Sequence, residues 1–277
     1  VVNNNTFTNL MARENLRFAA KTVSEMEQHH PEHFATLTHR TKLQMSEVED
    51  WQGAAERMYI PFDRNLGINP QDDSFLEREV WDIKATPRDH FPLLLSYHPL
   101  VIYRHQVIKQ ADVVLAMFLL GKDFSKTQKK HNFDYYDPLT TGDSSLSACI
   151  QAIIAAEIND MEKAVKYARY AVLMDLADIG GNVKDGCHIA SMGGTWMVAV
   201  YGFAGMRDDA GVLSFDPRLP RQIRCLQFPL CTRGQNLEVT VEHKKVSYLL
   251  REGTELTIFH RGHEIHLTQG TMEVCTD

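Results

Sequence analysis

The sequence predicts a mainly α-helical protein with a β tail: a closed helical barrel or irregular bundle followed by a small antiparallel sheet. Three observations predict this fold class. Apolar residues recur at helical spacing from about residue 7 to 205, short β-rich runs dominate after about residue 235, and the stretch Asp216-Pro217-Arg218-Leu219-Pro220 separates the two parts. With 277 residues, 44% of them hydrophobic, the chain can fill a sizeable core. We therefore predict a helical domain over 1–215 and a β domain over 216–277.

Six helices are expected in the first domain. The apolar spacing places them at 9–28, 46–58, 99–120, 144–158, 162–177 and 193–204. Polar loops are expected between them at 63–73, 85–93 and 122–139. The helices show no self-similar period, which disfavours a solenoid. In the β domain the expected strands are 237–241, 246–250, 256–259 and 265–267.

Composition excludes several classes of protein. The 29 basic and 36 acidic residues give a net charge of −7 without a basic cluster, so we expect no nucleic-acid partner. No apolar run approaches the roughly 18 residues of a membrane-spanning helix, so we expect no membrane partner. The five cysteines are far apart and form no C-x-x-C pair. We expect reduced thiols in a cytoplasmic protein, with neither disulfides nor a bound metal.

The segment expected to form the helix 99–120 carries one polar arc. On a helical wheel His105, Gln106, Lys109 and Gln110 fall together, while apolar side chains occupy nearly every other angle. The arc faces either a wet cavity or ordinary solvent, and the pattern does not decide between them. Lysine and glutamine can both donate to sugar hydroxyls, and glutamine also accepts.

A second candidate site lies at residues 185–196, where a turn of small residues leads into an apolar helical run. Free N–H groups at a helix start, with Gly193 and Gly194 allowing close approach, would suit an anion. His188, Ser191 and Thr195 would supply side-chain donors. A Gly-Gly pair at a helix start can equally serve packing, so both interpretations stay open.

The third candidate is the hydroxyl-rich stretch 140–147. Asp143 or Ser144 would cap the helix that follows, and Ser144 and Ser145 could also help to hold an anion. The other carboxylates do not form an evident acid/base pair.

Taken together, four segments resemble glycoside hydrolase family 65, the family of maltose, trehalose and kojibiose phosphorylases. They are 109–115 (KQADVVL), 141–147 (TGDSSLS), 188–196 (HIASMGGTW) and 201–207 (YGFAGMR). The resemblance implies that the chain is the C-terminal part of an (α/α)6 catalytic barrel followed by a small C-terminal antiparallel β-sheet domain. The start of the chain resembles the stretch that follows the family's general-acid glutamate. That glutamate is then expected upstream of residue 1, and the isolated chain is expected to be an inactive fragment.

The resemblance also implies roles for the candidate residues. Lys109 and Gln110 would bind the glucose that is transferred, and the phosphate site would comprise His188, Ser191, Gly193, Gly194 and Thr195, with Ser144 and Ser145 as weaker members. The implied reaction is inverting phosphorolysis of an α-linked glucosyl disaccharide, with inorganic phosphate as co-substrate and no other cofactor. The expected partners are the two substrates, the missing N-terminal part of the enzyme and further copies in a homo-oligomer.

Two rival functions follow from the same segments. A trehalase-like inverting hydrolase would place a carboxylate base where the phosphate ligands are expected. An inert sugar-binding or scaffold fragment would need neither.

Overall fold

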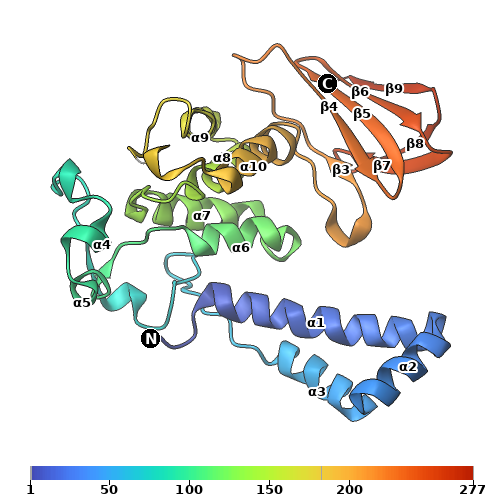
Figure 1. Ribbon diagram of the computed structural model, residues 1–277, viewed down its shortest axis with the longest axis horizontal. Helices are drawn as coiled ribbons and strands as arrows, with labels where there is room; N and C mark the ends of the chain where they lie inside the picture. The colour runs from blue at the N-terminus through green and yellow to red at the C-terminus, as the bar shows by residue number, and fades with distance from the viewer. Residues whose placement is uncertain (1, 182, 277) are drawn as a thin grey trace.

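The computed structural model describes residues 2–181 and 183–276, with a helical part first and a β part last (Figure 1). The helices are α1 (Thr6–His29), α2 (Pro31–Thr41), α3 (Met45–Glu56), α4 (Leu93–Ser96), α5 (Pro99–Ile102), α6 (Asp112–Leu119), α7 (Lys126–Tyr136), α8 (Ser147–Glu157), α9 (Met161–Leu173) and α10 (Ile189–Met197). The chain continues from α10 as a π-helical stretch, Val198–Phe203. Within the described residues, no helix is both long and apolar enough to cross a membrane.

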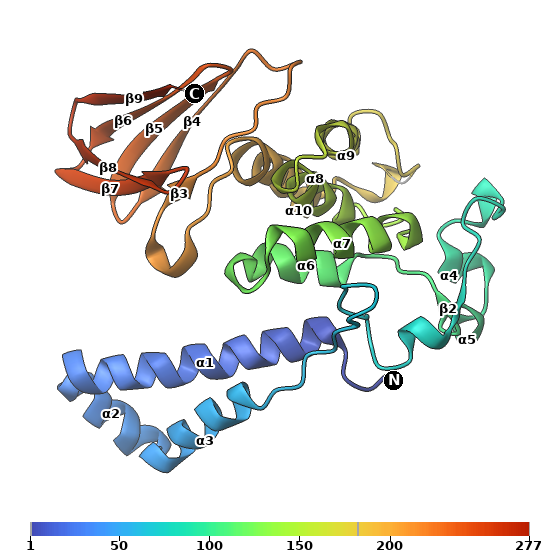
Figure 2. The same cartoon turned by 180° about the vertical axis from the view of Figure 1, so that it is seen from behind.

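The first three helices form an arm. Asn5 starts α1 because its side-chain oxygen accepts the Thr8 N–H at 2.9 Å. Helices α1 and α3 lie alongside each other, with α2 closing the far end (Figure 1). Ala20, Val23 and Val48 form a small core inside the arm. In both views α6–α10 lie beside the start of α1 and beside the β part, while the far end of the arm extends beneath the β part (Figures 1 and 2).

The helices α6–α10 surround a common core with α8 at its centre. Helix α8 contacts α6, α7, α9 and α10, and nine of its eleven residues are buried. Small side chains such as Ala152, Ala155 and Ala156 allow these close approaches. Helix α8 therefore packs on nearly all sides, with a different part of its surface against each neighbouring helix. This packing fixes the relative positions of the helix ends.

The β part consists of two sheets packed around a shared core. The larger is antiparallel in the order β4 (Cys225–Thr232), β5 (Gln235–Glu242), β6 (Lys245–Glu252), β9 (Met272–Thr276). The smaller joins β3 (Ser214–Phe215), β7 (Glu255–His260) and β8 (His263–Thr268). Leu237, Val239 and Val241 alternate inward along β5 and pack against Ile258 and Leu267 of the smaller sheet's strands.

The predicted fold class, mainly helical with a C-terminal antiparallel sheet, is confirmed. The four expected strands correspond to β5–β8, whereas β3, β4 and β9 were not predicted. Five of the six expected helices form with shifted ends.

The continuous helix expected over 99–120 is wrong. The segment divides into α5, strand β2 (His105–Gln106), a turn and α6, and β2 pairs with β1 (Glu79–Val80). Gln106 explains the break: its buried side chain donates to the Arg78 carbonyl at 2.7 Å and accepts from the Tyr135 hydroxyl. Backbone groups at Ile108 also pair with residues 139–141 rather than along a helix. His105, Gln106, Lys109 and Gln110 therefore do not form a helical arc.

The loop expected over 122–139 is also wrong, because α7 occupies most of it. Ser125 and Gln128 form a capping box at its start. This helix buries two polar side chains, Lys129 and Asn132, so its sequence lacks an apolar stripe. Lys129 pairs with Glu157, and the Asn132 side-chain oxygen accepts the Asn69 N–H at 2.8 Å.

Candidate active site

The N-terminal ends of α6 and α8 meet and bring two candidate segments together. The Gln110 side chain, just before α6, donates to the Ser144 hydroxyl at 2.7 Å. The Ser147 hydroxyl donates to the Lys109 carbonyl at 3.4 Å. The Lys109 and Gln110 side chains are exposed, while Ser144 is buried. The candidate glucose-binding pair thus lies beside the candidate serine pair.

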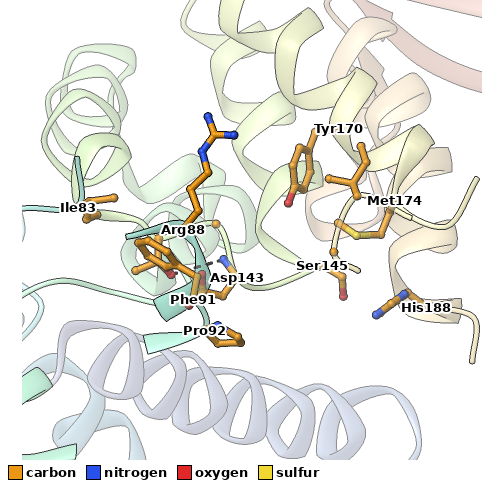
Figure 3. Close-up of a pocket in the computed structure, with 13 residues that line it drawn as sticks. Ile83, Arg88, Phe91, Pro92, Asp143, Ser145, Tyr170, Met174 and His188 are labelled. Atoms are coloured by element: carbon orange, nitrogen blue, oxygen red, sulfur yellow. Dashed lines mark hydrogen bonds between the residues drawn. The ribbon is translucent and has the colours of Figure 1, made fainter. Parts of the chain in front are cut away.

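A cleft of about 540 Å³ joins the turn before α8 to the start of α10. Asp143 and Ser145 come from that turn, His188 immediately precedes α10, and Tyr170 and Met174 come from α9 and its end. Figure 3 shows Ser145, His188, Met174 and Tyr170 on one side of the view. The opposite side is the loop around α4, which contributes Ile83, Arg88, Phe91 and Pro92.

A carboxylate outside the predicted set holds His188. The Asp175 carboxylate accepts the His188 backbone N–H at 2.9 Å and lies 2.6 Å from the ring Nδ1. The hydrogen bond from the His188 side chain lowers the pKa of Asp175, against a smaller opposing effect of desolvation. His188 therefore enters the cleft from a fixed backbone position with one ring nitrogen already occupied.

The expected placement of Gly193 and Gly194 at a helix start is wrong. Helix α10 begins at Ile189, so both glycines lie inside it. The first-turn N–H groups, which a helix leaves without an intrahelical partner, belong to residues 189–191, and the N–H of Ile189 donates to the Cys187 carbonyl at 3.1 Å. An added Cβ at Gly194 would lie 2.6 Å from the Cys149 Sγ, whereas one at Gly193 would meet nothing within 4 Å. Gly194 therefore serves the contact between α10 and α8, and Gly193 borders open space.

The other two candidate hydroxyls belong to the same helix. Ser191 is buried, and its hydroxyl has no hydrogen-bond partner among the described residues. The Thr195 hydroxyl donates to the Ser191 carbonyl at 3.1 Å, one turn earlier. Of the candidate phosphate ligands, the structure therefore brings Ser145 and His188 into one cleft and leaves Ser191 and Thr195 on the body of α10.

A second cavity, of about 240 Å³, connects the Gln110 turn to α10. Its lining includes Gln110, Asp112, Ser147 and Gly194 among mostly apolar side chains. Burial raises the pKa of Asp112, and a hydrogen bond from Gln71 at 3.1 Å opposes that rise. Ser144 and Ser145 are adjacent in sequence, so this serine pair links the Gln110 side to the His188 cleft.

Sequence reasoning missed two residues that line the cleft, Arg88 and Tyr170, and it missed Asp175, which contacts His188. Arg88 stands in a segment expected to be a loop, and Tyr170 faces inward from an amphipathic helix, so neither carried a local signal. Asp175 precedes His188 by 13 residues, and only the fold shows that they pair.

Comparisons with known proteins place this arrangement in a family. The model of the glycosyl hydrolase family 65 central catalytic domain matches residues 1–197, and that of the family's C-terminal domain matches residues 206–267. The chain belongs to glycosyl hydrolase family 65. The resemblance drawn from the four sequence segments is thereby confirmed, and the helical part belongs to the catalytic domain.

Several relatives are phosphorylases. The chain is 46% identical to an α,α-trehalose phosphorylase of Geobacillus stearothermophilus over 269 residues, which are 97% of this chain and 35% of that protein. It is 34% identical to a kojibiose phosphorylase of Caldanaerobacter subterraneus, over 92% of this chain and 33% of the relative.

A solved structure described as a candidate kojibiose phosphorylase from the human microbiome superimposes with a TM-score of 0.87 at 28% identity. It covers 99% of this chain and 36% of its own. The chain thus spans about a third of the length of the proteins it matches.

Proposed function

We propose that the chain contributes the phosphate site and part of the glucose site of an inverting disaccharide phosphorylase. One observation carries the proposal: Ser145 and His188 border one cleft, and Ser144 of the same serine pair is hydrogen-bonded to Gln110. The start of α10 follows His188 directly, so its first-turn N–H groups add to the electropositive character of this end.

The proposed reaction is a single displacement at the anomeric carbon. A phosphate oxygen forms a bond to that carbon as the glycosidic bond breaks, and the general acid protonates the departing oxygen. Phosphate is largely ionised near neutral pH, so the displacement needs no protein base. Attack from the opposite face inverts the centre and yields β-glucose 1-phosphate and a free sugar. His188 and the serine hydroxyls would position the phosphate and offset its charge.

The disaccharide we propose to test first is α,α-trehalose. Two trehalose phosphorylases are 46% and 42% identical to this chain, compared with 34% for a kojibiose phosphorylase and 33% for a maltose phosphorylase. The ranking reflects similarity over the part of the enzyme that this chain represents.

One observation favours a second candidate, an inverting hydrolase. The Asp143 carboxylate lines the same cleft, where a hydrolase would need a base to activate water. A hydrolase would release glucose without phosphate, so dependence on phosphate separates the two reactions.

The test uses a chimera in which the preceding part of the Geobacillus trehalose phosphorylase is joined to this chain. We expect it to release glucose 1-phosphate from trehalose only when phosphate is present, with slower release from kojibiose and maltose. His188→Ala should lower kcat/KM for phosphate by roughly 10- to 100-fold, the worth of a hydrogen bond to a charged group. The unmodified 277-residue chain and an otherwise identical assay without phosphate are the controls.

Two results would overturn the proposal. One is release of glucose at the same rate with and without phosphate, which would establish the hydrolase. The other is a folded chimera that cleaves none of the three sugars while the parent Geobacillus enzyme is active under the same conditions.

A further inference from the structure

The environment of His188 suggests a role for the residue that holds it. The Asp175 carboxylate makes two contacts with one residue: Oδ2 accepts the backbone N–H of His188 at 2.9 Å, and Oδ1 lies 2.6 Å from its ring Nδ1. The Asp175 side chain is mostly shielded, with 12% of it exposed. Both oxygens are therefore committed to His188.

An ionised carboxylate only accepts hydrogen bonds, so the ring Nδ1 must carry the proton of the 2.6 Å contact. The other nitrogen, Nε2, lies on the opposite edge of the ring, and the ring borders the cleft (Figure 3). With Nδ1 occupied, Nε2 is the ring position left to exchange a proton or a hydrogen bond with a ligand there.

We propose that Asp175 is the positioning residue of the phosphate site: it fixes Nδ1–H of His188 and presents Nε2 to the incoming phosphate. The proposal rests on the proposed function for the identity of the ligand, whereas the choice of ring nitrogen follows from the contacts alone. Asp175 contacts His188 and is not among the residues that line the cleft, so it does not need to touch phosphate.

The geometry explains why a backbone contact accompanies the ring contact. Asp175 follows α9, and His188 precedes α10, so one carboxylate closes the loop between the two helices. The contact of Oδ2 holds the His188 backbone in place, and the contact of Oδ1 then sets the orientation of the ring. Positioning thus requires both oxygens to be acceptors.

Asp175→Asn tests this requirement because it keeps the size of the side chain and replaces one acceptor by a donor. The backbone N–H of His188 can only donate, so the asparagine oxygen should take that contact. The NH₂ group then faces Nδ1 and donates to it, which moves the proton of the neutral ring to Nε2. We expect the variant to reverse the tautomer of His188.

Asp178→Asn is the matched control. Asp178 belongs to the same loop, and its side chain accepts the Val183 N–H at 3.0 Å, away from His188. Its replacement should disturb the loop to a similar degree and leave the ring tautomer unchanged.

The first measurement is the ¹⁵N spectrum of histidine-labelled 277-residue chain at a pH where the ring is neutral, with His188 assigned through His188→Gln. Wild type and Asp178→Asn should show a protonated Nδ1, and Asp175→Asn a protonated Nε2. A wild-type ring protonated at Nε2 would overturn the proposal, and this outcome does not depend on whether any variant folds.

The second measurement uses the chimera described above. Asp175→Asn should raise KM for phosphate by roughly tenfold relative to Asp178→Asn, with a smaller effect on KM for the disaccharide. Equal phosphate KM values in the two variants would overturn the positioning role. A chimera without phosphorolysis would instead contradict the proposed function. The tautomer measurement on the 277-residue chain would still test whether Asp175 sets the protonated nitrogen of His188.

Discussion

The helical part and the β part of this chain differ in how much of their large apolar side chains they leave exposed. The core of the β part lies between its two sheets, where Leu237, Tyr248, Leu250 and Ile258 are fully buried, and Val200 of the π-helical stretch adds to it. The helical part also has a buried core around α8, yet it exposes large side chains such as Leu95 at 84% and Leu176 at 82%.

Some of these exposed residues form a stripe. Ile189, Met192 and Trp196 are spaced by three and four residues along α10, which places them on one face of the helix, and all three are exposed. Apolar stripes of this kind mark surfaces that another chain segment covers. The matched relatives are about three times as long as this chain, and we expect their further catalytic-domain segments to lie against such a face. Among the described residues of the β part, the large apolar side chains that are exposed are Met272 and Val274 of the edge strand β9.

An ion cluster joins the two regions, and breaking it should have the largest effect. The Glu157 carboxylate at the end of α8 accepts from Lys129 of α7 and, at 2.8 Å, from Arg207, which leads into the β part. Glu157→Ala leaves two cations without their shared anion and should lower the free energy of unfolding by about 3–5 kcal/mol. Denaturant unfolding followed by tryptophan fluorescence measures this, because Trp51, Trp81 and Trp196 all lie in the helical part.

The same cluster predicts a pH dependence. Burial alone would raise the pKa of Glu157, but Arg207 and Lys129 outweigh it and lower the pKa overall. The contribution of Glu157 is therefore fully present above the unfolded-state pKa of about 4.3 and is lost as pH falls through the lower folded-state value. Glu162→Ala, at an exposed position of α9, is the control and should change stability by less than about 0.5 kcal/mol. Equal losses for the two variants would contradict the cluster's role.

A pair of leucine substitutions tests the comparison directly. Leu250 of β6 is fully buried, and Leu95 of α4 is 84% exposed. Leu250→Ala should cost about 2–5 kcal/mol through lost burial and the cavity left behind, and Leu95→Ala less than about 0.5 kcal/mol. Hydrogen exchange of the β5 and β6 amides in the whole chain measures the stability change of Leu250→Ala. Denaturant unfolding followed by tryptophan fluorescence measures that of Leu95→Ala. A large effect of Leu95→Ala would show that the helical part covers this residue by itself in solution.

The parts of the fold that the sequence predicted are those whose pattern is local. Strands β5 and β8 alternate inward and outward residues, and α1 and α9 carry apolar stripes. Helix α7 lacks such a stripe because Lys129 and Asn132 are buried through partners elsewhere in the chain. The break before α6 was equally invisible, since the Gln106 side chain bonds to residues 28 and 29 positions away.

In the candidate site, too, residues with a local sequence pattern were predicted and residues placed by long-range contacts were not. The local sequence pattern singled out His188, Ser144 and Ser145 as candidate anion ligands, and the family resemblance gave them a role at phosphate. The fold shows that their segments converge. The predicted start of the last long helix was four residues late, because the small residues Ala190, Ser191, Gly193 and Gly194 are typical of a turn. Asp175, whose carboxylate binds the His188 N–H where the helix actually begins, could not be inferred from spacing.

The two glycines of α10 give the smallest and most discriminating test. Gly194→Ala would bring a methyl group to 2.6 Å from the Cys149 Sγ and should cost about 1–3 kcal/mol through overpacking. Gly193→Ala meets open space in a helix interior and should stabilise the chain by about 0.5–1 kcal/mol, because alanine loses less backbone entropy on folding. Thermal unfolding of the two variants measures both, and equal shifts would contradict the packing described for Gly194.

Gly193→Ala also separates stability from function. The family resemblance assigns Gly193 to the phosphate site, although Gly193 is not among the residues that line the His188 cleft. If that role holds, the added methyl group should raise the phosphate KM of the chimera even though the chain unfolds at a higher temperature. A stabilised variant with unchanged phosphate KM would remove Gly193 from the phosphate site and leave His188 and the serine pair as its ligands.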